Sequence, residues 1–472
     1  MVNIQPMKVF MEPRSIAIIG VSRDTGEDSF NILENIMNHG FSGKVYPVNP
    51  GVDQILGVKI YPSVADISEE IDLAVIASPR STVLKIVREC AEKQVKGIII
   101  VAQGFGDGDD GGKALQAEMI EIARESGARI MGPNSLGIAN SSCNLNTSFA
   151  PAKLDNVPVG IICQSGLFPP GPPRLVLAGK AIDLGNACDI DVCDGLEYFE
   201  TDPDTKIIVL YIEGIEQGRR FIEVAGRVSK SKPILALKSG RSESGRKAAQ
   251  SHTGSLAGND QIYDAAFKQT GVIRTTDIEE LVDLTSAFSS LPLIKGRRIG
   301  IISMSGAGGV ITADACQRHK LKVAELSPGT LVEVRRLFPP WLAISNPFDA
   351  WPAFQVSGYP YAEVVNNALK LMLSDEGVDG VVCISGIFGK EEFFDPSPAI
   401  IQAVNTFKDK PVVCWLYGNY ADTAAKLEES GKVGVFPSCE RAVNALARLR
   451  EYAEFLEGNP SLLRPVFSVG YK

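Results

Sequence analysis

The sequence predicts an α/β protein made of three tandem doubly wound parallel-sheet domains. Two observations support this fold class. Apolar segments of strand length end in turns of small residues, and the same order of four such segments occurs three times along the 472 residues. Strands with continuous apolar runs are buried on both faces, as in parallel sheets. Amphipathic stretches between them, such as residues 82–93, are expected to form crossover helices. A single large α/β domain is the alternative.

The expected strands follow the same order in each module. The opening strands are expected within residues 15–22, 158–166 and 298–309. The next two sets are expected within residues 71–78, 206–214 and 378–386, and within 96–105, 232–240 and 410–418. The closing strands are expected within residues 128–134, 271–277 and 431–438. Apolar residues at helical spacing predict helices from Ile278 and from Glu440. The domains are therefore placed at 1–150, 155–292 and 296–460, with linkers at 150–157 and 291–296.

Composition and charge exclude several classes of protein. The net charge is −9, so no basic field is expected to hold nucleic acid or an anionic membrane. The apolar runs are far shorter than the ~20 residues of a membrane span, and the first twelve residues lack the apolar core of an export signal. Nine cysteines without C-x-x-C spacing indicate reduced thiols, a cytoplasmic location and no metal site.

The turn after the first strand is a candidate anion site, because ligands of open α/β sheets bind beyond the carboxyl ends of the strands. Residues 20–23 (Gly-Val-Ser-Arg) lack the G-x-G-x-x-G fingerprint, and the second strand ends at Asn49 without an acidic residue. A plain NAD site is therefore disfavoured, and no P-loop is present. Small residues, a helix N-terminus and the Arg23 guanidinium suit a phosphate, and Lys44 adds a second cation. An ordinary strand–helix turn with a solvated Arg23 is the alternative.

His252 is the candidate nucleophile among three histidines, since His39 and His319 are expected at helix ends in structural roles. It lies in residues 238–258, a segment rich in Gly, Ser and Ala with four basic residues and one acidic residue. This composition predicts a mobile, locally basic loop. A neutral imidazole is a good nucleophile, and a basic loop suits its phosphorylated form. A plain polar loop residue is the alternative.

Two other strand ends of the same module carry groups that could assist His252. Glu213 follows a strand, and its carboxylate could hold the second imidazole nitrogen and fix its tautomer. The turn of Gln164, Ser165 and Gly166 could donate hydrogen bonds to phosphate oxygens.

Residues 250–258 (QSHTGSLAG) resemble the phosphohistidine loop of the NDP-forming acyl-CoA synthetases. This family includes the ADP-forming acetate–CoA ligases and is related to succinyl-CoA synthetase. The resemblance extends from about residue 9 to about residue 452, and it implies a Rossmann-like CoA-binding domain followed by two flavodoxin-like ligase domains. Its other matching pieces are residues 20–23, 43–50, 132–137, 184–186, 211–214 and 346–349.

The resemblance implies a reversible reaction in which acyl-CoA, phosphate and ADP give an acid, CoA and ATP. His252 would carry the phosphoryl group, Glu213 would steady its imidazole, and Gln164, Ser165 and Gly166 would line the phosphate pocket. The implied CoA-binding residues are Gly20, Val21, Ser22, Arg23, Lys44, Asn49, Pro50, Ala77, Ser78, Pro79, Gln103, Gly104 and Asn134. The third module would be mostly structural and interface-forming.

Two departures from the family pattern bear on these expectations. Residues 167–173 (LFPPGPP) stand where the family has a helix after the Gln-Ser-Gly turn. Because proline is tolerated only in the first turn of a helix, this run is expected to delay or abolish that helix. The family's nucleotide-grasping domain is not expected in this sequence, so ADP or ATP with Mg²⁺ would be bound by a separate ATP-grasp beta subunit of a hetero-oligomer. A non-catalytic regulatory relative that binds CoA or acyl-CoA is the alternative, and the identity of the small carboxylic acid stays open.

Overall fold

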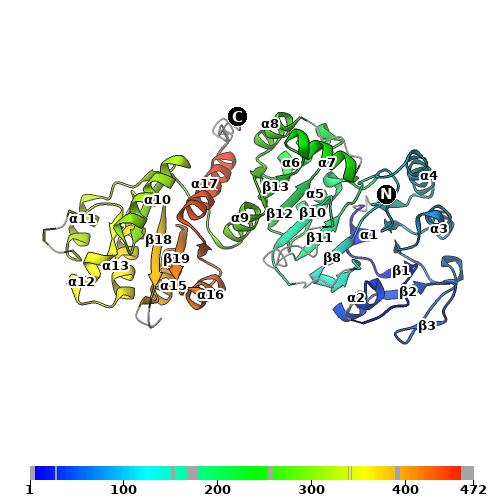
Figure 1. Cartoon of the computed structure of the whole chain (residues 1–472), viewed down its shortest axis with the longest axis horizontal. Helices are drawn as coiled ribbons and strands as arrows, with labels where there is room; N and C mark the ends of the chain where they lie inside the picture. The colour runs from blue at the N-terminus through cyan, green and yellow to red at the C-terminus, as the bar shows by residue number, and fades with distance from the viewer. Residues whose placement is uncertain are drawn as a thin grey trace. The chain divides into compact units, whose positions relative to one another are not determined.

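The chain divides into two compact units, Met1–Ile278 and Glu279–Lys472 (Figure 1). The computed structural model describes residues 6–26, 29–149, 155–166, 179–253, 259–338, 340–341, 343–388 and 394–458, and for residues 249–253 it describes the backbone alone. The first unit holds two large sheets and the second unit holds one. Within the described ranges, no helix is both long enough and apolar enough to span a bilayer.

The first sheet is parallel throughout and has the order β2-β1-β5-β6-β7. Its strands are β1 (Ser15–Ile19), β2 (Lys44–Val48), β5 (Leu73–Ile76), β6 (Gly97–Ile100) and β7 (Arg129–Met131). The accompanying elements are α1 (Lys8–Met11), α2 (Ile32–His39), α3 (Arg80–Glu92), α4 (Asp110–Ser126), the short helix η1 (Val64–Asp66) and the hairpin of β3 (Gln54–Ile55) and β4 (Val58–Lys59). Both faces are covered: Ile16 and Ile18 pack in one core with α2, whereas Ala17 and Ile19 pack in another with α3 and α4.

The second sheet has the order β14-β13-β12-β10-β11-β8-β9. Its parallel strands are β10 (Val159–Cys163), β11 (Lys180–Asp183), β12 (Ile207–Ile212), β13 (Ile234–Lys238) and β14 (Ile273–Thr275). Its helices are η2 (Ser141–Cys143), α5 (Val192–Thr201), α6 (Gly218–Val228), α7 (Glu243–Thr253) and α8 (Asp260–Thr270). Two antiparallel strands at one edge, β8 (Gly137–Asn140) and β9 (Leu145–Asn146), come from residues that the sequence placed in the first module.

The sheet of the second unit has the order β16-β15-β18-β19-β20, and β17 pairs with β15. Its strands are β15 (Arg298–Ser303), β16 (Lys322–Val323), β17 (Phe348–Asp349), β18 (Gly380–Ile387), β19 (Val412–Gly418) and β20 (Gly434–Phe436). The helices are α9 (Ile278–Ser290), α10 (Gly306–Arg318), α11 (Pro328–Arg335), α12 (Ala350–Ser357), α13 (Tyr361–Ser374), α15 (Ser397–Thr406), α16 (Ala421–Glu429) and α17 (Cys439–Leu456).

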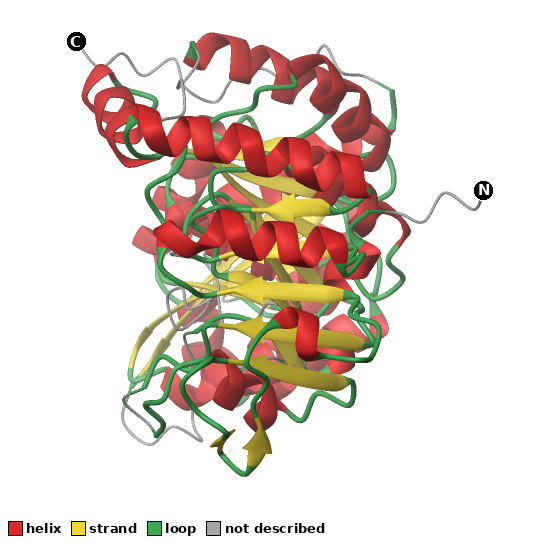
Figure 2. Ribbon diagram, turned by 90° about the vertical axis from the view of Figure 1, so that its right-hand side faces the viewer, coloured by secondary structure: helices red, strands yellow, loops and turns green. Residues whose placement is uncertain are grey.

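The five parallel strands of each sheet share one spatial order. Numbered by their sequence within each sheet, and with the additional two-residue parallel strand β17 of the third sheet left out of the numbering, they run 2-1-3-4-5 in all three cases. Strand layers with helices on either side can be followed in Figure 2. In this order the first and third strands are neighbours whose connections leave in opposite directions, so each sheet has a ligand-binding crevice at their carboxyl ends. The three-module α/β fold class is therefore confirmed.

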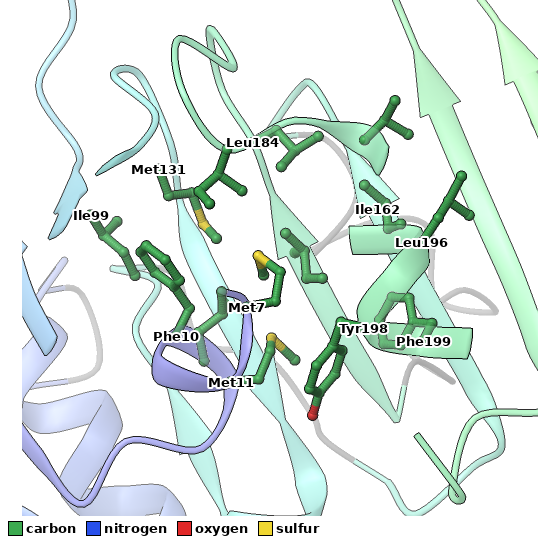
Figure 3. Close-up of a cluster of buried hydrophobic side chains, with 14 of the residues drawn as sticks. Met7, Phe10, Met11, Ile99, Met131, Ile162, Leu184, Leu196, Tyr198 and Phe199 are labelled. Atoms are coloured by element: carbon green, nitrogen blue, oxygen red, sulfur yellow. The ribbon is translucent and has the colours of Figure 1, made fainter. Parts of the chain in front are cut away.

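A single hydrophobic core joins the two sheets of the first unit. Phe10 and Met11 of α1, together with Met7 just before this helix, are fully buried within it. Figure 3 shows these side chains between Ile99 and Met131 on the first-sheet side and Ile162, Tyr198 and Phe199 on the second-sheet side. Residues before the first strand thus help to hold the two sheets together.

Helix α9 packs against α17 through charged side chains. Arg441 contacts Asp283 and Glu279, and Arg448 contacts Glu280 at 3.2 Å. The sequence placed residues 278–290 in the second module, whereas these contacts lie in the second unit.

Replacing Glu280 with alanine should lower the free energy of unfolding of the second unit by roughly 2 kcal/mol, because Arg448 would stay buried with one acidic partner, Glu451, at 2.9 Å. The control is Glu279→Ala, since the Glu279 side chain is 78% exposed and its pair with Arg441 should contribute less than about 0.5 kcal/mol. Urea unfolding followed by circular dichroism measures both. Equal losses of unfolding free energy in the two variants would contradict the conclusion that the buried Glu280–Arg448 pair contributes more than the exposed Glu279–Arg441 pair.

Candidate functional site

The turns after β1 and β5 meet at the crevice of the first sheet. Gly20 has a left-handed backbone with φ of 84°, and its N–H donates to Val48 O at 3.0 Å. A Cβ atom here would lie 2.4 Å from Ser78 Oγ and 2.7 Å from Ala77 O. Glycine is therefore required at this position both for its conformation and for the close approach of the second turn.

Two amide side chains, the buried Asn31 and the half-buried Asn49, hold the remainder of the first turn. Asn31 caps α2 and donates from Nδ2 to Ser22 O at 3.2 Å. Asn49 donates from Nδ2 to Val21 O at 3.0 Å, and its Oδ1 accepts from Gly51 N at 3.1 Å. The Arg23 guanidinium donates to Gly51 O at 3.4 Å. Because the Arg23 side chain is exposed, its charge stays accessible to an anion.

A cavity of about 330 Å³ opens beside this turn. Gly20, Val21, Ser22 and Ala77, four of the expected CoA-binding residues, line it. The aromatic pair Phe30 and Phe149 also lines it, with ring centroids 5.7 Å apart in an edge-to-face arrangement. Sequence reasoning missed this pair, because more than a hundred residues separate the two rings and no local pattern joins them.

The other expected CoA-binding loops surround the same edge. Pro79 precedes α3 as its N-cap, and Gly104 follows β6 with φ of 91°. Asp107 accepts hydrogen bonds from Gly104 N at 3.1 Å and from Phe105 N at 3.0 Å. Asn134 has φ of 61° and donates from its backbone to Ala102 O at 3.0 Å, next to Gln103. The structure thus brings these loops together.

Lys44 does not lie at this edge. It is the first residue of β2 and pairs with Ser15 at the start of β1, whereas Asn49 and Pro50 follow the carboxyl end of β2. At about 3.3 Å per residue, the strand separates Lys44 from the crevice by roughly 13 Å. Lys44 lines a different cavity of about 740 Å³ at the amino ends of the strands. The expectation that it joins the anion site is therefore corrected.

Gln164 ties two turns of the second sheet together. Its Oε1 accepts from Glu213 N at 2.7 Å and from Gly214 N at 3.1 Å, and its Nε2 donates to Gly214 O at 3.0 Å. The sequence assigned this amide to phosphate oxygens, but the structure commits it to the backbone. Ser165 and Gly166 follow it at the carboxyl edge. The proline-rich run at 167–173 lies outside the described residues.

Glu213 occupies the strand end at which the sequence expected it, and it is only 5% exposed. His252 lies in α7, where the sequence predicted a loop. Glu243, Arg246, Lys247 and Ala248 are good helix formers, and Lys247 pairs with Glu243 one turn earlier at 3.0 Å. The pairing of Glu213 with His252 stays a prediction, because the His252 side chain is outside the described atoms.

The positive charge expected around His252 is largely compensated or buried. Lys238 ends β13 and is 1% exposed, with its ammonium donating to Ser239 O and lying 4.6 Å from the centre of the Tyr263 ring. Burial lowers the pKa of Lys238 to about 8. Arg241 lies 3.6 Å from Asp260.

The loop from β7 to β8 links the carboxyl edges of the two sheets. Asp183, at the end of β11, accepts from Leu136 N at 2.8 Å and from Gly185 N at 3.2 Å. Burial raises the pKa of Asp183 to about 6, against the effect of these two N–H groups. A Cβ on Gly166 would lie 3.0 Å from Leu136 Cδ1, so the linking loop packs on the turn after β10.

Sequence reasoning assigned no role to Asp183, Asp107 or Asn186, although Asn186 donates to Asp107 at 2.7 Å. Asp183 ends a buried strand and precedes the Leu-Gly-Asn piece of the family, which is the one signal that could have found it.

Two protein families match this chain over consecutive regions. Residues 14–141 match the family described as "CoA binding domain", and residues 157–288 match the family described as "Succinyl-CoA ligase like flavodoxin domain". The first match covers the first sheet, and the second covers the parallel strands of the second sheet.

Similar proteins extend over nearly the whole chain. The alpha subunit of acetate–CoA ligase [ADP-forming] II from Pyrococcus furiosus is 40% identical over 93% of this chain and 95% of the relative. The acetate–CoA ligase [ADP-forming] of Methanocaldococcus jannaschii is also 40% identical, and this chain spans 63% of its length. The solved acetyl-coenzyme A synthetase 1 of Ca. Korarchaeum cryptofilum, in complex with phosphate and ADP, is 30% identical, with a TM-score of 0.85 and coverage of 98% of this chain and 100% of that chain.

The resemblance found in the sequence is therefore confirmed. The chain belongs to the NDP-forming acyl-CoA synthetases, the family that contains the alpha subunits of the ADP-forming acetate–CoA ligases.

Proposed function

We propose that this chain is the CoA-binding, phosphohistidine-bearing subunit of an ADP-forming acid–CoA ligase. The observation that carries this proposal is the junction of the two carboxyl edges in the first unit. The loop from β7 to β8 runs from the edge that carries Gly20 and Asn134 to the edge that carries Ser165 and Glu213. A thioester held at the first edge would present its carbonyl carbon to a phosphate at the second.

The first edge suits CoA by its shape and its polarity. The cavity has an apolar, partly aromatic lining for a pantetheine or adenine group. Arg23, which follows the lining residue Ser22, and the N-terminal turns of α2 and α3 suit the phosphates of the ligand. We assign CoA binding to Gly20, Val21, Ser22, Arg23, Asn49, Pro50, Ala77, Ser78, Pro79, Gln103, Gly104 and Asn134.

The proposed reaction proceeds by three group transfers. A phosphate oxygen attacks the thioester carbonyl, the C–S bond breaks, and the thiolate takes the proton released by the phosphate. An imidazole nitrogen of His252 then attacks phosphorus, and the acid leaves as its carboxylate. ADP finally takes the phosphoryl group from nitrogen, which gives ATP and restores the neutral imidazole. Dividing the reaction in this way gives every step a good leaving group.

The second edge would contact the phosphoryl group through main-chain N–H groups of Ser165 and Gly166, since the Gln164 amide is committed to residues 213–214. Glu213 would hold the imidazole, as a buried carboxylate orients a catalytic histidine. The transfer of the phosphoryl group to the imidazole, the second of the three transfers, needs the His252 side chain to reach the strand ends.

We also propose a partner that binds ADP or ATP with Mg²⁺ through an ATP-grasp domain. The relatives from Pyrococcus furiosus are named alpha subunits, and this chain spans 63% and 68% of the length of the relatives from Methanocaldococcus jannaschii and Archaeoglobus fulgidus. The acid substrate is a small carboxylate, and acetate is the first candidate because it appears in the names of several relatives.

Gly20→Ala should weaken CoA binding at least tenfold, because the new methyl group would displace the turn at Ala77 and Ser78. Titration calorimetry of the full chain with CoA measures this. The matched control is Gly57→Ala, which has a similar φ of 78° but no atom within 4 Å of the new Cβ. Unchanged affinity in Gly20→Ala, or equal losses in both variants, would remove this turn from the site.

His252→Asn should abolish incorporation of acid-labile ³²P from labelled phosphate and acetyl-CoA, and Glu213→Gln should reduce it at least tenfold, because the imidazole loses its orienting carboxylate. His319→Asn is the control, since His319 Nε2 lies 2.8 Å from Glu440 in the other unit. Full labelling of His252→Asn would exclude His252 as the carrier. No labelling of the unchanged chain, with CoA binding intact, would favour the non-catalytic regulatory alternative.

A further inference from the structure

Asp183 is a fully buried carboxylate at the point where the two sheets of the first unit meet. Its two oxygens accept from Leu136 N at 2.8 Å and from Gly185 N at 3.2 Å. The Cys163 thiol, which donates to Ile182 O at 3.6 Å, also interacts with this carboxylate, and Ser135 Oγ donates to the Asp183 carbonyl. With an exposed fraction of 0%, its carboxylate does not touch a ligand at the surface of the crevice.

The negative charge of Asp183 is unfavourable for the stability of the fold. Burial opposes its ionisation, and the nearby Glu213 carboxylate opposes it further. A raised pKa in the folded state means that the protonated form stabilises the fold fully below the ordinary carboxyl pKa near 4, and that this contribution is lost as the pH rises through about 6. A charge kept at such a place indicates a role other than stability.

The Asp183 carboxylate supports two loops of the proposed CoA site. Through Leu136 it holds the loop that contains Asn134. Through Gly185 it holds the next residue, Asn186, whose side chain donates to Asp107 at 2.7 Å.

The two supported loops are also in direct contact with the residues that would bind CoA. Asp107 accepts from Gly104 N and Phe105 N and so shapes the turn after β6. A Cβ on Gly185 would lie 2.2 Å from Pro133 O, so the turn after β11 lies directly against the loop after β7.

We propose that Asp183 is a positioning residue for CoA, whose ionised carboxylate holds the loops at Asn134 and Gly104 in their binding geometry. This rests on the proposed CoA binding and adds to it a dependence on one buried charge. Protonation turns one carboxylate oxygen into a donor, which weakens one of the two N–H contacts and releases a loop. Two other titratable groups, the Cys163 thiol and the Glu213 carboxylate, also interact with this carboxylate.

The sign of the effect separates a positioning role from a structural one. Between pH 7.5 and pH 5, protonation of Asp183 favours the fold but should weaken CoA binding. An amide at this position carries no charge and presents an NH₂ group to one of the two N–H donors. Asp183→Asn should therefore bind CoA about tenfold more weakly at pH 7.5 and lose the pH dependence of affinity shown by the unchanged chain. A merely structural Asp183 would make the stability and the CoA affinity of the unchanged chain change in the same direction between pH 7.5 and pH 5.

The test is titration calorimetry of the full chain with CoA and with dephospho-CoA from pH 5 to pH 8. Dephospho-CoA is included because it lacks the terminal phosphate monoester, which itself titrates near pH 6. We expect the affinity of the unchanged chain for dephospho-CoA to fall about tenfold from pH 7.5 to pH 5. Asp183→Asn should show the weaker affinity at every pH. Asp379→Asn, a buried carboxylate paired with Arg298 in the other unit, is the matched control and should behave as the unchanged chain.

Asn186→Ala provides a second test that leaves Asp183 in place. It should weaken CoA binding severalfold and keep the pH dependence, because only the contact with Asp107 is lost. Unchanged affinity of Asp183→Asn at pH 7.5, or an unchanged pH dependence in that variant, would overturn the proposal while leaving CoA binding itself intact. No CoA binding by the unchanged chain at any pH would instead overturn the proposed function, and this inference with it.

Discussion

The arrangement of the first unit depends on how the chain passes between its two sheets. It leaves β7 at the carboxyl edge of the first sheet and enters β8 antiparallel to β11, at the carboxyl edge of the second. The connecting loop is therefore short, and Asp183 holds it through Leu136 N. This one crossing therefore links two carboxyl edges, the edges at which ligands of open α/β sheets bind. In two separate domains without this crossing, the chain would not hold the two carboxyl edges next to each other.

Electrostatics at the second edge are more balanced than its composition suggests. Lys238 is buried, and this burial lowers the pKa of its ammonium group to about 8. Arg241 and Lys247 have acidic partners. A phosphate here would be bound mainly by backbone N–H groups, which need no counter-ion and no reorganisation. Buried Asp183 and Glu213 add negative charge to the same edge. In the proposed reaction, such an edge would favour transfer of the phosphoryl group over tight binding of it.

The sequence showed correctly which residues end the strands, and it went wrong where side-chain partners decide the role. Gly20 and Glu213 could be found because a carboxyl strand end is a local feature, readable from an apolar run followed by a turn. Lys44 was misplaced because the sequence motif that contains it spans the whole of β2. Lys44 lies at the amino end of this strand, whereas Asn49 follows its carboxyl end. Gln164 was assigned to phosphate although its amide is used by the backbone of residues 213–214, which come from a different strand.

The sequence by itself determined the three-module α/β fold, because each apolar run and each helical period is a local consequence of burial on both faces of a parallel sheet. It also determined the family, through short motifs. Only the tertiary structure decided that β8 joins the second sheet, that α9 packs on α17, and that Asp183 supports the loops at Asn134 and Gly104. These features depend on contacts between residues distant in sequence, and such contacts leave no periodic pattern in the chain that makes them.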